Sequence, residues 1–541
     1  MGWLLNILGN LISIAIAIGI IVLIGFALFS KRKKKDDIEM DKVDRVVLDV
    51  NLVDEKKNDF GLSKAMTMED LKKALTVLEK DKKIKELALD MDSFDCSLAQ
   101  MVELDPYLER IKKNKKVTAY ATSLEMQDYL CAVAADSIYV LDSNSSRISL
   151  EAPSSSTMYY KRILDKLGIR MHVIHVGAYK GTGENYSLDK MSPERRESIH
   201  ELQEQTLSAM MERIQKYRHI DIKEDLLSGK WYYTGRKEAL SAGLIDGFAA
   251  YMDMPRNNEN KTVSINRYFS EKYKEKEKKK QDEILVFPLS GTIREKDGLN
   301  DAGLLSQIRQ IKDHENAKGI VLYINSPGGS ALESEKMYQR LKALDLPVYA
   351  FQSEVAASGG YYICSAAKKI YATPFTITGS IGVVSMIPNV SGAIKKLDIT
   401  VENENTGNYE SFDPTLPLSK EVEDKIRASM LETYAEFKER VKSARGMDED
   451  TLEPLAGGRV YLGCKAKEIG LIDEVGTLED CIKALAKELN LTSYAVKTIY
   501  KKQDLQDRFP LPLDKLNTEA MRILSQDAGI QMLEPEYQSI F

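Results

Sequence analysis

Residues 320–330 read Ile320-Val321-Leu322-Tyr323-Ile324-Asn325-Ser326-Pro327-Gly328-Gly329-Ser330, and the order of residue types here indicates the fold class of this 541-residue chain. The first five residues are apolar, as in a strand that is buried on both faces. Pro327, Gly328 and Gly329 then force a sharp turn whose amide groups are exposed. The pattern from Glu333 to Leu344 predicts a helix. A buried strand, a tight turn and a helix together predict one unit of a largely parallel α/β sheet.

The chain contains two copies of such a unit. Near the end of the first half, Gly243-Leu244-Ile245-Asp246 matches Gly470-Leu471-Ile472-Asp473 near the end of the second. Two further segment pairs match in the same order, which predicts an internal duplication. Those pairs are residues 84–93 with 317–326, and 131–139 with 363–371. Each copy is expected to begin with a strand and a helix, at 46–50 and 68–78 in the first and at 284–289 and 303–311 in the second.

The length, charge and composition set the domain organisation. A chain of 541 residues exceeds the usual size of a single core, and its net charge of −6 argues against a general nucleic-acid binder. Every residue of 271–280 except Tyr273 is charged, which favours a solvated connector between the copies. We therefore expect a membrane anchor with a basic flank at 1–35, a first α/β domain at 36–258, the charged connector at 259–282 and a second α/β domain at 283–541.

The N-terminal region predicts a single transmembrane helix. Leu11 to Phe29 is a nineteen-residue run without a charge, close to the ~20 residues that cross a bilayer. The basic run Lys31 to Lys35 follows it directly, as at a membrane surface. No basic residue precedes the apolar run, so a cleaved signal peptide fits poorly. The positive-inside rule then places the large domains in the cytoplasm.

A second turn of small residues, Ala356-Ala357-Ser358-Gly359-Gly360, lies between a strand expected at Val348 to Phe351 and a helix expected at Tyr361 to Ala367. A serine at a helix N-terminus is most often a cap. Here the alanine and glycine neighbours leave the Ser358 Oγ uncovered, which favours a nucleophile. The amides of Gly329 and Gly359 can stabilise the oxyanion of acyl transfer, and one such donor contributes ~3–4 kcal/mol.

A serine nucleophile needs a base, and no histidine is placed to supply it. His172 and His175 lie three residues apart on an apolar strand and thus on opposite faces, which is unsuitable for a joint ligand site. We expect core or surface positions for all five histidines, His172, His175, His200, His219 and His314. The pattern Ser365-Ala366-Ala367-Lys368 falls inside a helix, where Ser365 is expected to pack and Lys368 to face solvent.

Comparison of the two copies indicates a lysine instead. At the position of Ser358 the first copy has Met126, so it carries no nucleophile. At the positions of the glycine turn it has Asp95 and Cys96, so it carries no oxyanion turn either. The parts of one site would then be divided between the copies.

The lysine lies in a loop of the first copy, Gly177-Ala178-Tyr179-Lys180, which aligns with Gly407-Asn408-Tyr409-Glu410 of the second. Lys180 acts as a general base only if its pKa falls from ~10.4 towards ~7–8. That change requires roughly 3–5 kcal/mol of desolvation. Burial at an interface between two domains can supply it.

These motifs, in this order, resemble the signal peptide peptidase A (protease IV) family in its long, tandem form. The resemblance extends from about Arg45 to Leu489 and is carried by residues 179–180, 325–330, 356–360 and 378–383. More distantly, the glycine turn and the alanine-serine turn resemble the proteolytic subunit of Clp protease. The resemblance implies that Ser358 is the nucleophile, Lys180 the general base, and Gly329 and Gly359 the oxyanion donors. It also implies that Ser380 orients the lysine.

The resemblance further implies a fold and a substrate class. The fold is two crotonase-like α/β domains per chain, assembled as a membrane-anchored homotetramer. The substrates are remnant signal peptides and other short hydrophobic peptides, cleaved through an acyl-enzyme with no cofactor and no metal. The family presents its catalytic domains outside the cell membrane, whereas Lys31 to Lys35 favour the inner face. The sequence therefore predicts neither the side of the membrane that holds the catalytic domains nor the role of residues 492–541.

Two other classes of function remain as alternatives. A crotonase-like acyl-CoA enzyme would use the same oxyanion turn to bind a thioester, but it does not require a serine with a lysine. An inactive membrane scaffold would use the helices and the charged connector to recruit partners. Labelling of Ser358 by a serine-directed probe, and its dependence on Lys180, separates these alternatives from a peptidase.

Overall fold

The computed structural model describes residues 40, 42–54, 65–257, 261–274, 281–404, 406, 413–502 and 531–532. The predicted transmembrane run, its basic flank and the loop 407–410 lie outside these ranges. Within them, no helix combines the length and the apolar character that crossing a membrane requires.

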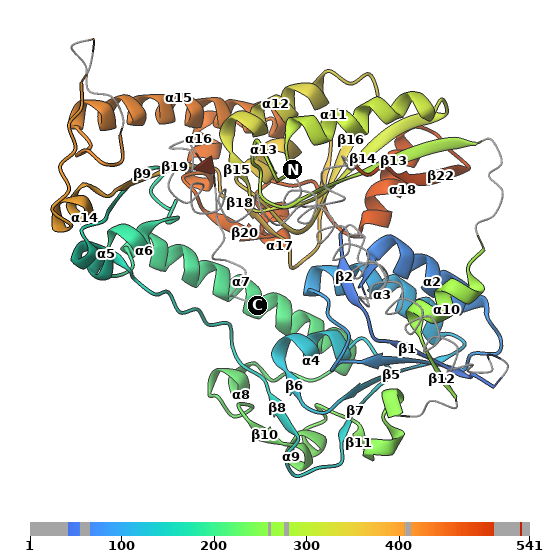
Figure 1. Ribbon diagram of the computed structural model, residues 1–541. Helices are drawn as coiled ribbons and strands as arrows, with labels where there is room; N and C mark the ends of the chain where they lie inside the picture. The colour runs from blue at the N-terminus through green and yellow to red at the C-terminus, as the bar shows by residue number, and fades with distance from the viewer. Residues whose placement is uncertain are drawn as a thin grey trace, which may run out of the picture.

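The first half of the chain forms a six-stranded sheet in which every neighbouring pair is parallel (Figure 1). Consecutive side chains of its central strand β4, Leu87, Ala88 and Leu89, are fully buried, as expected for a sheet covered on both faces. In spatial order the strands are β11 (Gly247–Ala249), β7 (Ser137–Leu141), β5 (Lys116–Ala121), β4 (Glu86–Asp90), β1 (Arg45–Leu48) and β12 (Thr262–Ser264).

The helices of the first half begin at side-chain caps. The Thr67 hydroxyl accepts from the Asp70 amide at the start of α2, and Ser97 forms a capping box with Gln100 at the start of α3. The helices are α2 (Met68–Lys80), α3 (Leu98–Lys112), α4 (Met126–Ala132), α5 (Lys161–Leu167), α6 (Glu184–Ser187), α7 (Pro193–Arg218), α8 (Lys223–Leu227), α9 (Arg236–Ser241) and α10 (Ile265–Lys272). The remaining strands are β2 (Asn51–Val53), β3 (Ala65–Thr67), β6 (Leu124–Glu125), β8 (Arg147–Ser149), β9 (Arg170–Val176) and β10 (Thr234–Gly235).

The second half repeats the same parallel strand order. Its core strands are β21 (Glu474–Val475), β17 (Ile370–Ala372), β16 (Val348–Ala357), β14 (Ala317–Ser326), β13 (Asp282–Ser290) and β22 (Tyr494–Thr498). The end of β16 also pairs with β18 (Ile377–Gly379), which pairs with β20 (Val460–Leu462). The helices are α11 (Asp301–Ile308), α12 (Ala331–Lys342), α13 (Gly359–Cys364), α14 (Ser391–Lys396), α15 (Lys420–Arg445), α16 (Glu449–Leu452), α17 (Gly463–Glu468) and α18 (Leu478–Glu488).

The aspartates of the two Gly-Leu-Ile-Asp motifs make equivalent contacts in the two halves. The Asp246 carboxylate accepts from the Ile138 amide at 2.8 Å, and the Asp473 carboxylate accepts from the Ile370 amide at 2.7 Å. In each half an arginine at the end of a 26-residue helix pairs with this aspartate. These arginines are Arg218 of α7 and Arg445 of α15. Equal strand orders and equal contacts confirm the duplication predicted from the sequence.

A separate four-stranded sheet ties the two halves together. The strand β9 of the first half runs antiparallel to β19 (Val383–Asn389) of the second over seven residue pairs. Two short strands, β15 (Gly329–Ser330) and β23 (Gln531–Met532), complete this sheet. In Figure 1 the chain leaves the first sheet at α5, α6 and β9 and lies beside α14 and β19.

The hydrophobic cores are shared across the same boundary. Val355, Phe375 and Val460 of the second half lie in the core cluster of the first half. Ile174 and Val176 of β9 lie in the core of the second. Burial of such side chains stabilises by about 1.5–3 kcal/mol each, so the two halves are held together by a continuous apolar interface.

The domain limits differ from those expected. Within the predicted connector at 259–282, residues 262–264 form β12 at the edge of the first sheet, and α10 packs against α2. The pairing of β12 with β1 buries Val263, which explains why this segment is ordered. The strand predicted to end at Phe351 continues to Ala357, because Val355 to Ala357 pair with β18. Ser358 therefore follows a strand directly.

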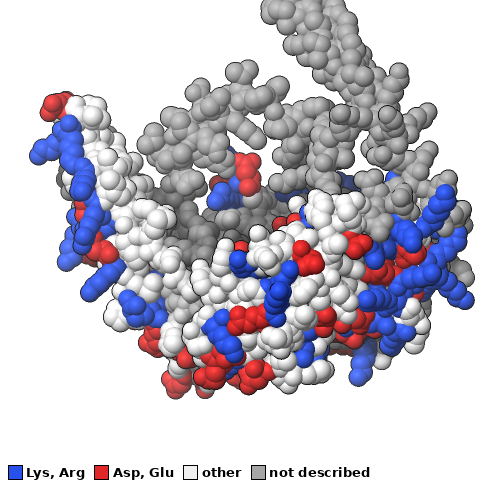
Figure 2. All heavy atoms as spheres, turned by 90° about the horizontal axis from the view of Figure 1, so that it is seen from below, with Lys and Arg blue, Asp and Glu red and all other residues white. Residues whose placement is uncertain are grey.

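Basic and acidic side chains are intermixed on the lower face of the molecule, shown in Figure 2. Exposed helices elsewhere on the molecule also carry opposite charges one turn apart, such as Lys425 with Glu421 in α15. Such pairs contribute only ~0.2–0.5 kcal/mol each. These surface pairs therefore add little to the stability of the fold, which comes mainly from its hydrophobic cores.

A pair of carboxyl groups lies at the boundary of the two halves, behind the glycine turn. The Asn325 side chain donates to Asp54 at 3.1 Å and lies 3.5 Å from Glu354. Burial, together with the charge of Asp54, raises the pKa of Glu354 from 4.5 to about 7. The folded state therefore retains this proton above the pH at which the unfolded chain loses it.

The variant Glu354→Gln tests whether the raised pKa of Glu354 makes the stability of the fold depend on pH. A raised pKa stabilises the fold below about pH 4.5, and that contribution is lost as the pH rises towards about 7. The wild type should lose up to about 3 kcal/mol in this interval from Glu354, and Glu354→Gln should remove that loss. Urea unfolding between pH 5 and 8 measures it, with the exposed Glu468→Gln as control. Equal pH slopes for the two variants would contradict the prediction.

Candidate active site

Ser358 sits on a strained turn between β16 and α13. Its φ of 56° and ψ of −119° lie in a region that residues other than glycine rarely adopt. The turn is held by the Ser358 amide, which donates to the Gly379 carbonyl at 2.8 Å. A Cβ at Gly360 would lie 2.5 Å from the Ser326 carbonyl oxygen, so a larger residue could not follow here. This local geometry fixes the direction of the Ser358 side chain.

Lys180 reaches Ser358 from the other half of the molecule. It follows β9 in a short loop and is only 1% exposed. Its Nζ donates to the Ser358 Oγ at 3.1 Å, although the two residues are 178 positions apart. The structure thus brings together the two residues that the sequence comparison paired, and both side chains are buried.

Ser380 is the third member of this group. Lys180 Nζ donates to the Ser380 Oγ at 2.6 Å and to its carbonyl oxygen at 3.3 Å. Ser380 is fully buried and also has a positive φ, 55°. Ser380 therefore contacts the lysine directly, and its role in orienting the lysine stays a prediction. Two hydroxyl oxygens and one carbonyl oxygen, all from the second half of the chain, surround the Nζ and accept hydrogen bonds from it.

The predicted oxyanion donors lie next to each other. Gly329 has a φ of 150°, and a Cβ there would lie 2.1 Å from the Ile293 carbonyl oxygen. A Cβ at Gly359 would lie 3.3 Å from the Gly329 amide nitrogen and 2.5 Å from the Ser334 Oγ. Only glycine is accommodated at either position. The Gly329 amide nitrogen thus lies against Gly359, the residue after Ser358, and the role of the two amides as oxyanion donors stays a prediction.

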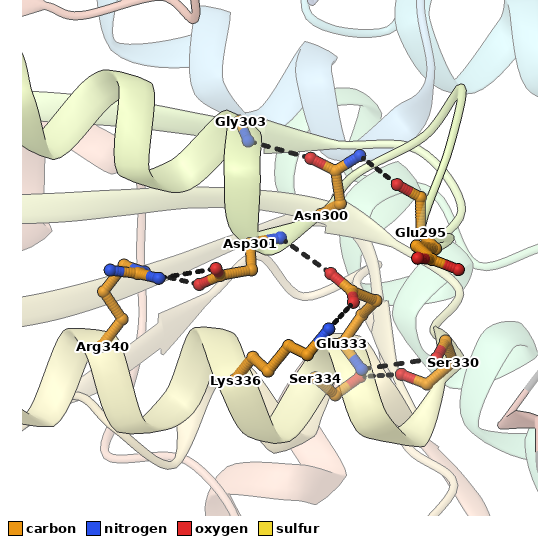
Figure 3. A network of polar contacts seen from close by, with 9 residues as sticks. All are labelled: Glu295, Asn300, Asp301, Gly303, Ser330, Glu333, Ser334, Lys336 and Arg340. Carbon is orange, nitrogen blue, oxygen red and sulfur yellow. Dashed lines mark hydrogen bonds and ion pairs between the residues drawn. The ribbon is translucent and has the colours of Figure 1, made fainter.

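The glycine turn is anchored by the first turn of α12, shown in Figure 3. The Ser330 hydroxyl accepts from the Glu333 amide at 3.3 Å, and its carbonyl accepts from the Ser334 hydroxyl at 2.8 Å. The Glu333 carboxylate accepts from the Asp301 amide of α11 at 3.0 Å. Arg340 in turn forms a two-point contact with the Asp301 carboxylate. The turn next to the oxyanion donors is therefore fixed by two helices.

The other candidate bases lie elsewhere. Lys368 is exposed and pairs with Glu488, and the Ser365 hydroxyl donates to the Tyr361 carbonyl, so the Ser365–Lys368 pattern is structural as expected. The His175 ring contacts the Thr182 carbonyl, and burial lowers the pKa of that histidine. His314 pairs with Glu283, at the start of β13.

One segment of the site was missed by sequence reasoning. Gly457, Gly458 and Arg459 of the second half lie against the loop that carries Lys180. The Gly457 carbonyl accepts from the Tyr179 amide at 2.8 Å. The adjacent glycines were the available signal, but glycine pairs mark many ordinary turns. Only the tertiary structure shows that these glycines lie against the loop that carries Lys180.

Comparison with known proteins agrees with this geometry. The model described as Peptidase family S49 matches residues 109–264 and 340–492, one segment in each half and together more than half of the chain. The model described as Clp protease matches residues 293–379, which include the glycine turn and Ser358.

Individual relatives cover most of the chain. "Protease 4" of Haemophilus influenzae is 28% identical over 446 residues, which are 77% of this chain and 72% of that protein. "Serine protease SPPA, chloroplastic" of Arabidopsis thaliana is 27% identical over 461 residues, 80% of this chain and 67% of the relative. "Putative signal peptide peptidase SppA" of Enterococcus faecium is 37% identical over 201 residues, 36% of this chain and 58% of the relative.

Proposed function

The chain belongs to peptidase family S49, the serine proteases of the SppA (protease IV) type, and on this premise we propose that Ser358 and Lys180 form its catalytic dyad. The observation that carries the proposal is the 3.1 Å contact between the Lys180 Nζ and the Ser358 Oγ. Both groups are buried, and the Nζ donates to the Ser358 Oγ and to the Oγ and carbonyl oxygen of Ser380. Such surroundings favour the neutral amine that a general base requires.

In the proposed reaction, neutral Lys180 accepts the proton of the Ser358 hydroxyl as its Oγ attacks the carbonyl carbon of the scissile peptide bond. The amides of Gly329 and Gly359 donate to the oxyanion of the tetrahedral intermediate. The C–N bond then breaks, and the Lys180 ammonium group returns its proton to the leaving amine. Water attacks the carbonyl carbon of the acyl-enzyme while Lys180 accepts a proton from it. The ester C–O bond then breaks, and the Lys180 ammonium group returns that proton to the Ser358 Oγ, which regenerates both residues.

The proposed substrates are remnant signal peptides and other short hydrophobic peptides. The support comes from the relative that is named a putative signal peptide peptidase, and from the apolar anchor that would hold the enzyme where such peptides remain. The proposed assembly is a homotetramer at the cell membrane, held by one transmembrane helix at residues 11–29. The resemblance to the tandem family supports this assembly.

Reaction with a fluorophosphonate tests the dyad. The wild-type chain should be labelled at Ser358, and Ser358→Ala should lose the label completely. Lys180→Ala should lower both labelling and peptide hydrolysis by roughly 10²–10⁴-fold, since it removes the general base. Lys368→Ala is the matched control and should be labelled as the wild type. Labelling of Lys180→Ala at the wild-type rate would exclude Lys180 as the base.

The pH dependence of hydrolysis tests the protonation state of the lysine. Because the neutral amine is the reactive form, kcat/KM should rise with pH as Lys180 loses its proton. The apparent pKa should lie below the ~10.4 of a free lysine, since burial disfavours the ammonium form. Steady-state rates on a hydrophobic peptide between pH 6 and 10 measure it. A flat profile over this range would contradict the proposed base.

Membrane extraction tests the anchor. The full-length chain should stay with membranes in alkaline carbonate, and a chain beginning at residue 36 should be released. Release of the full-length chain would overturn the anchor. Protease added to intact spheroplasts then assigns the face, because it degrades the catalytic domains if they lie outside. Protection until the membrane is opened assigns them to the cytoplasm, as residues 31–35 indicate.

A further inference from the structure

Three consecutive residues of the second half contact both elements that position the Lys180 Nζ. These residues, Gly457 to Arg459, form a segment that precedes β20. The Gly457 carbonyl accepts from the Tyr179 amide at 2.8 Å, on the lysine loop. The Arg459 carbonyl accepts from the Ser380 amide at 2.6 Å, on the turn that receives the lysine. One short segment therefore joins the donor and the acceptor sides of the contact between Lys180 and Ser380.

The backbone of this segment lies directly against the lysine. Gly458 has a φ of 93°, and a Cβ there would lie 2.5 Å from the backbone nitrogen of Lys180 and 2.7 Å from the Lys180 Cβ. A Cβ at Gly177 would lie 2.7 Å from the Gly457 carbonyl oxygen. Two segments of the chain meet here backbone to backbone, so small displacements of residues 457–459 pass to the lysine without a flexible side chain between them.

The Arg459 side chain fixes the segment from the outside. Its guanidinium carbon lies 3.4 Å from the centre of the Tyr179 ring, the residue before Lys180. The same guanidinium pairs with Glu201 at 2.7 Å and Glu197 at 2.9 Å, both on α7. Its hydrogen bond lowers the pKa of the Glu197 carboxyl, so that partner stays charged at neutral pH. A planar guanidinium can stack on a ring and pair with two carboxylates at once, which a lysine ammonium cannot.

We propose that Arg459 is a positioning residue for the Ser358–Lys180 dyad. Its side chain holds Tyr179 and α7 of the first half, while its carbonyl holds the Ser380 turn. Together these contacts set the distance and direction of the Lys180 Nζ relative to the Ser358 Oγ and keep the lysine loop closed to water. The inference rests on the proposed function, because it assigns Arg459 a role only through Lys180.

The test measures the rate of fluorophosphonate labelling against pH for Arg459→Ala and Arg459→Lys in the full-length chain. A displacement near 1 Å between reacting groups lowers the rate by about 10²-fold, so Arg459→Ala should react roughly 10–100-fold more slowly. Its apparent pKa should rise, because a loosened loop admits water around Lys180. Arg459→Lys should keep only part of the wild-type labelling rate, since a lysine retains the positive charge but has no planar group to stack on Tyr179.

Arg236→Ala is the matched control. Arg236 also lies over an aromatic ring, Phe248 at 4.7 Å, and pairs with a carboxylate, Asp142, but on the first sheet away from the site. It should lower the melting temperature by a similar amount and leave the labelling rate and pH profile unchanged. If Arg459→Ala does not fold, the same comparison is made with Arg459→Lys and with Glu201→Gln, which removes one carboxylate partner.

The outcomes separate this inference from the proposed function. Full labelling of Lys180→Ala would overturn the dyad and the inference with it. If Lys180→Ala is unreactive while Arg459→Ala matches Arg236→Ala in rate and profile, the dyad stands and the positioning role is wrong. A slower Arg459→Ala with the wild-type pH profile would also overturn the role, because the defect would then lie away from Lys180.

Discussion

The contact between the Lys180 Nζ and the Ser358 Oγ depends on the docking of two halves of one chain. A lysine can accept a proton near neutral pH only where water is largely excluded, and neither half alone surrounds this side chain. The second half contributes Ser380 and the glycines at 382 and 458, which lie against the lysine. The first half contributes the loop that follows β9. The ladder between β9 and β19 and the shared apolar core therefore serve the chemistry as much as the stability.

The two halves have kept one architecture and divided the chemistry. Their parallel sheets have the same strand order, and Asp246 and Asp473 hold equivalent strands. In the first half, however, the position of the nucleophile turn begins α4, and the Gln127 side chain donates to the Cys96 carbonyl at 3.1 Å. A cavity of about 330 Å³ remains there, lined in part by Phe375 and Glu354 of the other half. The first copy thus has no serine at this position, and its proposed contribution to the site is Lys180.

The sequence predicted those parts of the fold and site that depend on local patterns. Buried strands followed by tight turns identified the α/β units, and the alanine and glycine neighbours of Ser358 singled it out as a candidate nucleophile, but its strained backbone came only from the structure. The copy comparison identified Lys180 because duplicated segments keep corresponding positions even where their roles differ. The extension of β16 to Ala357 was missed, since it depends on pairing with β18. The segment at 457–459 was missed because its partner lies more than 270 positions earlier in the chain.

The sequence by itself determined the duplication, the parallel α/β class and the serine and glycine turns, and it singled out Lys180 as the candidate base. These follow from side-chain size, backbone freedom and repeat, which are properties of neighbouring residues. Only the tertiary structure decided that Lys180 reaches Ser358 within one chain, that Ser380 receives its Nζ, and that Arg459 ties both sides together. The contacts between the two halves join residues more than 170 positions apart, and their distances follow from how the halves pack rather than from any local preference.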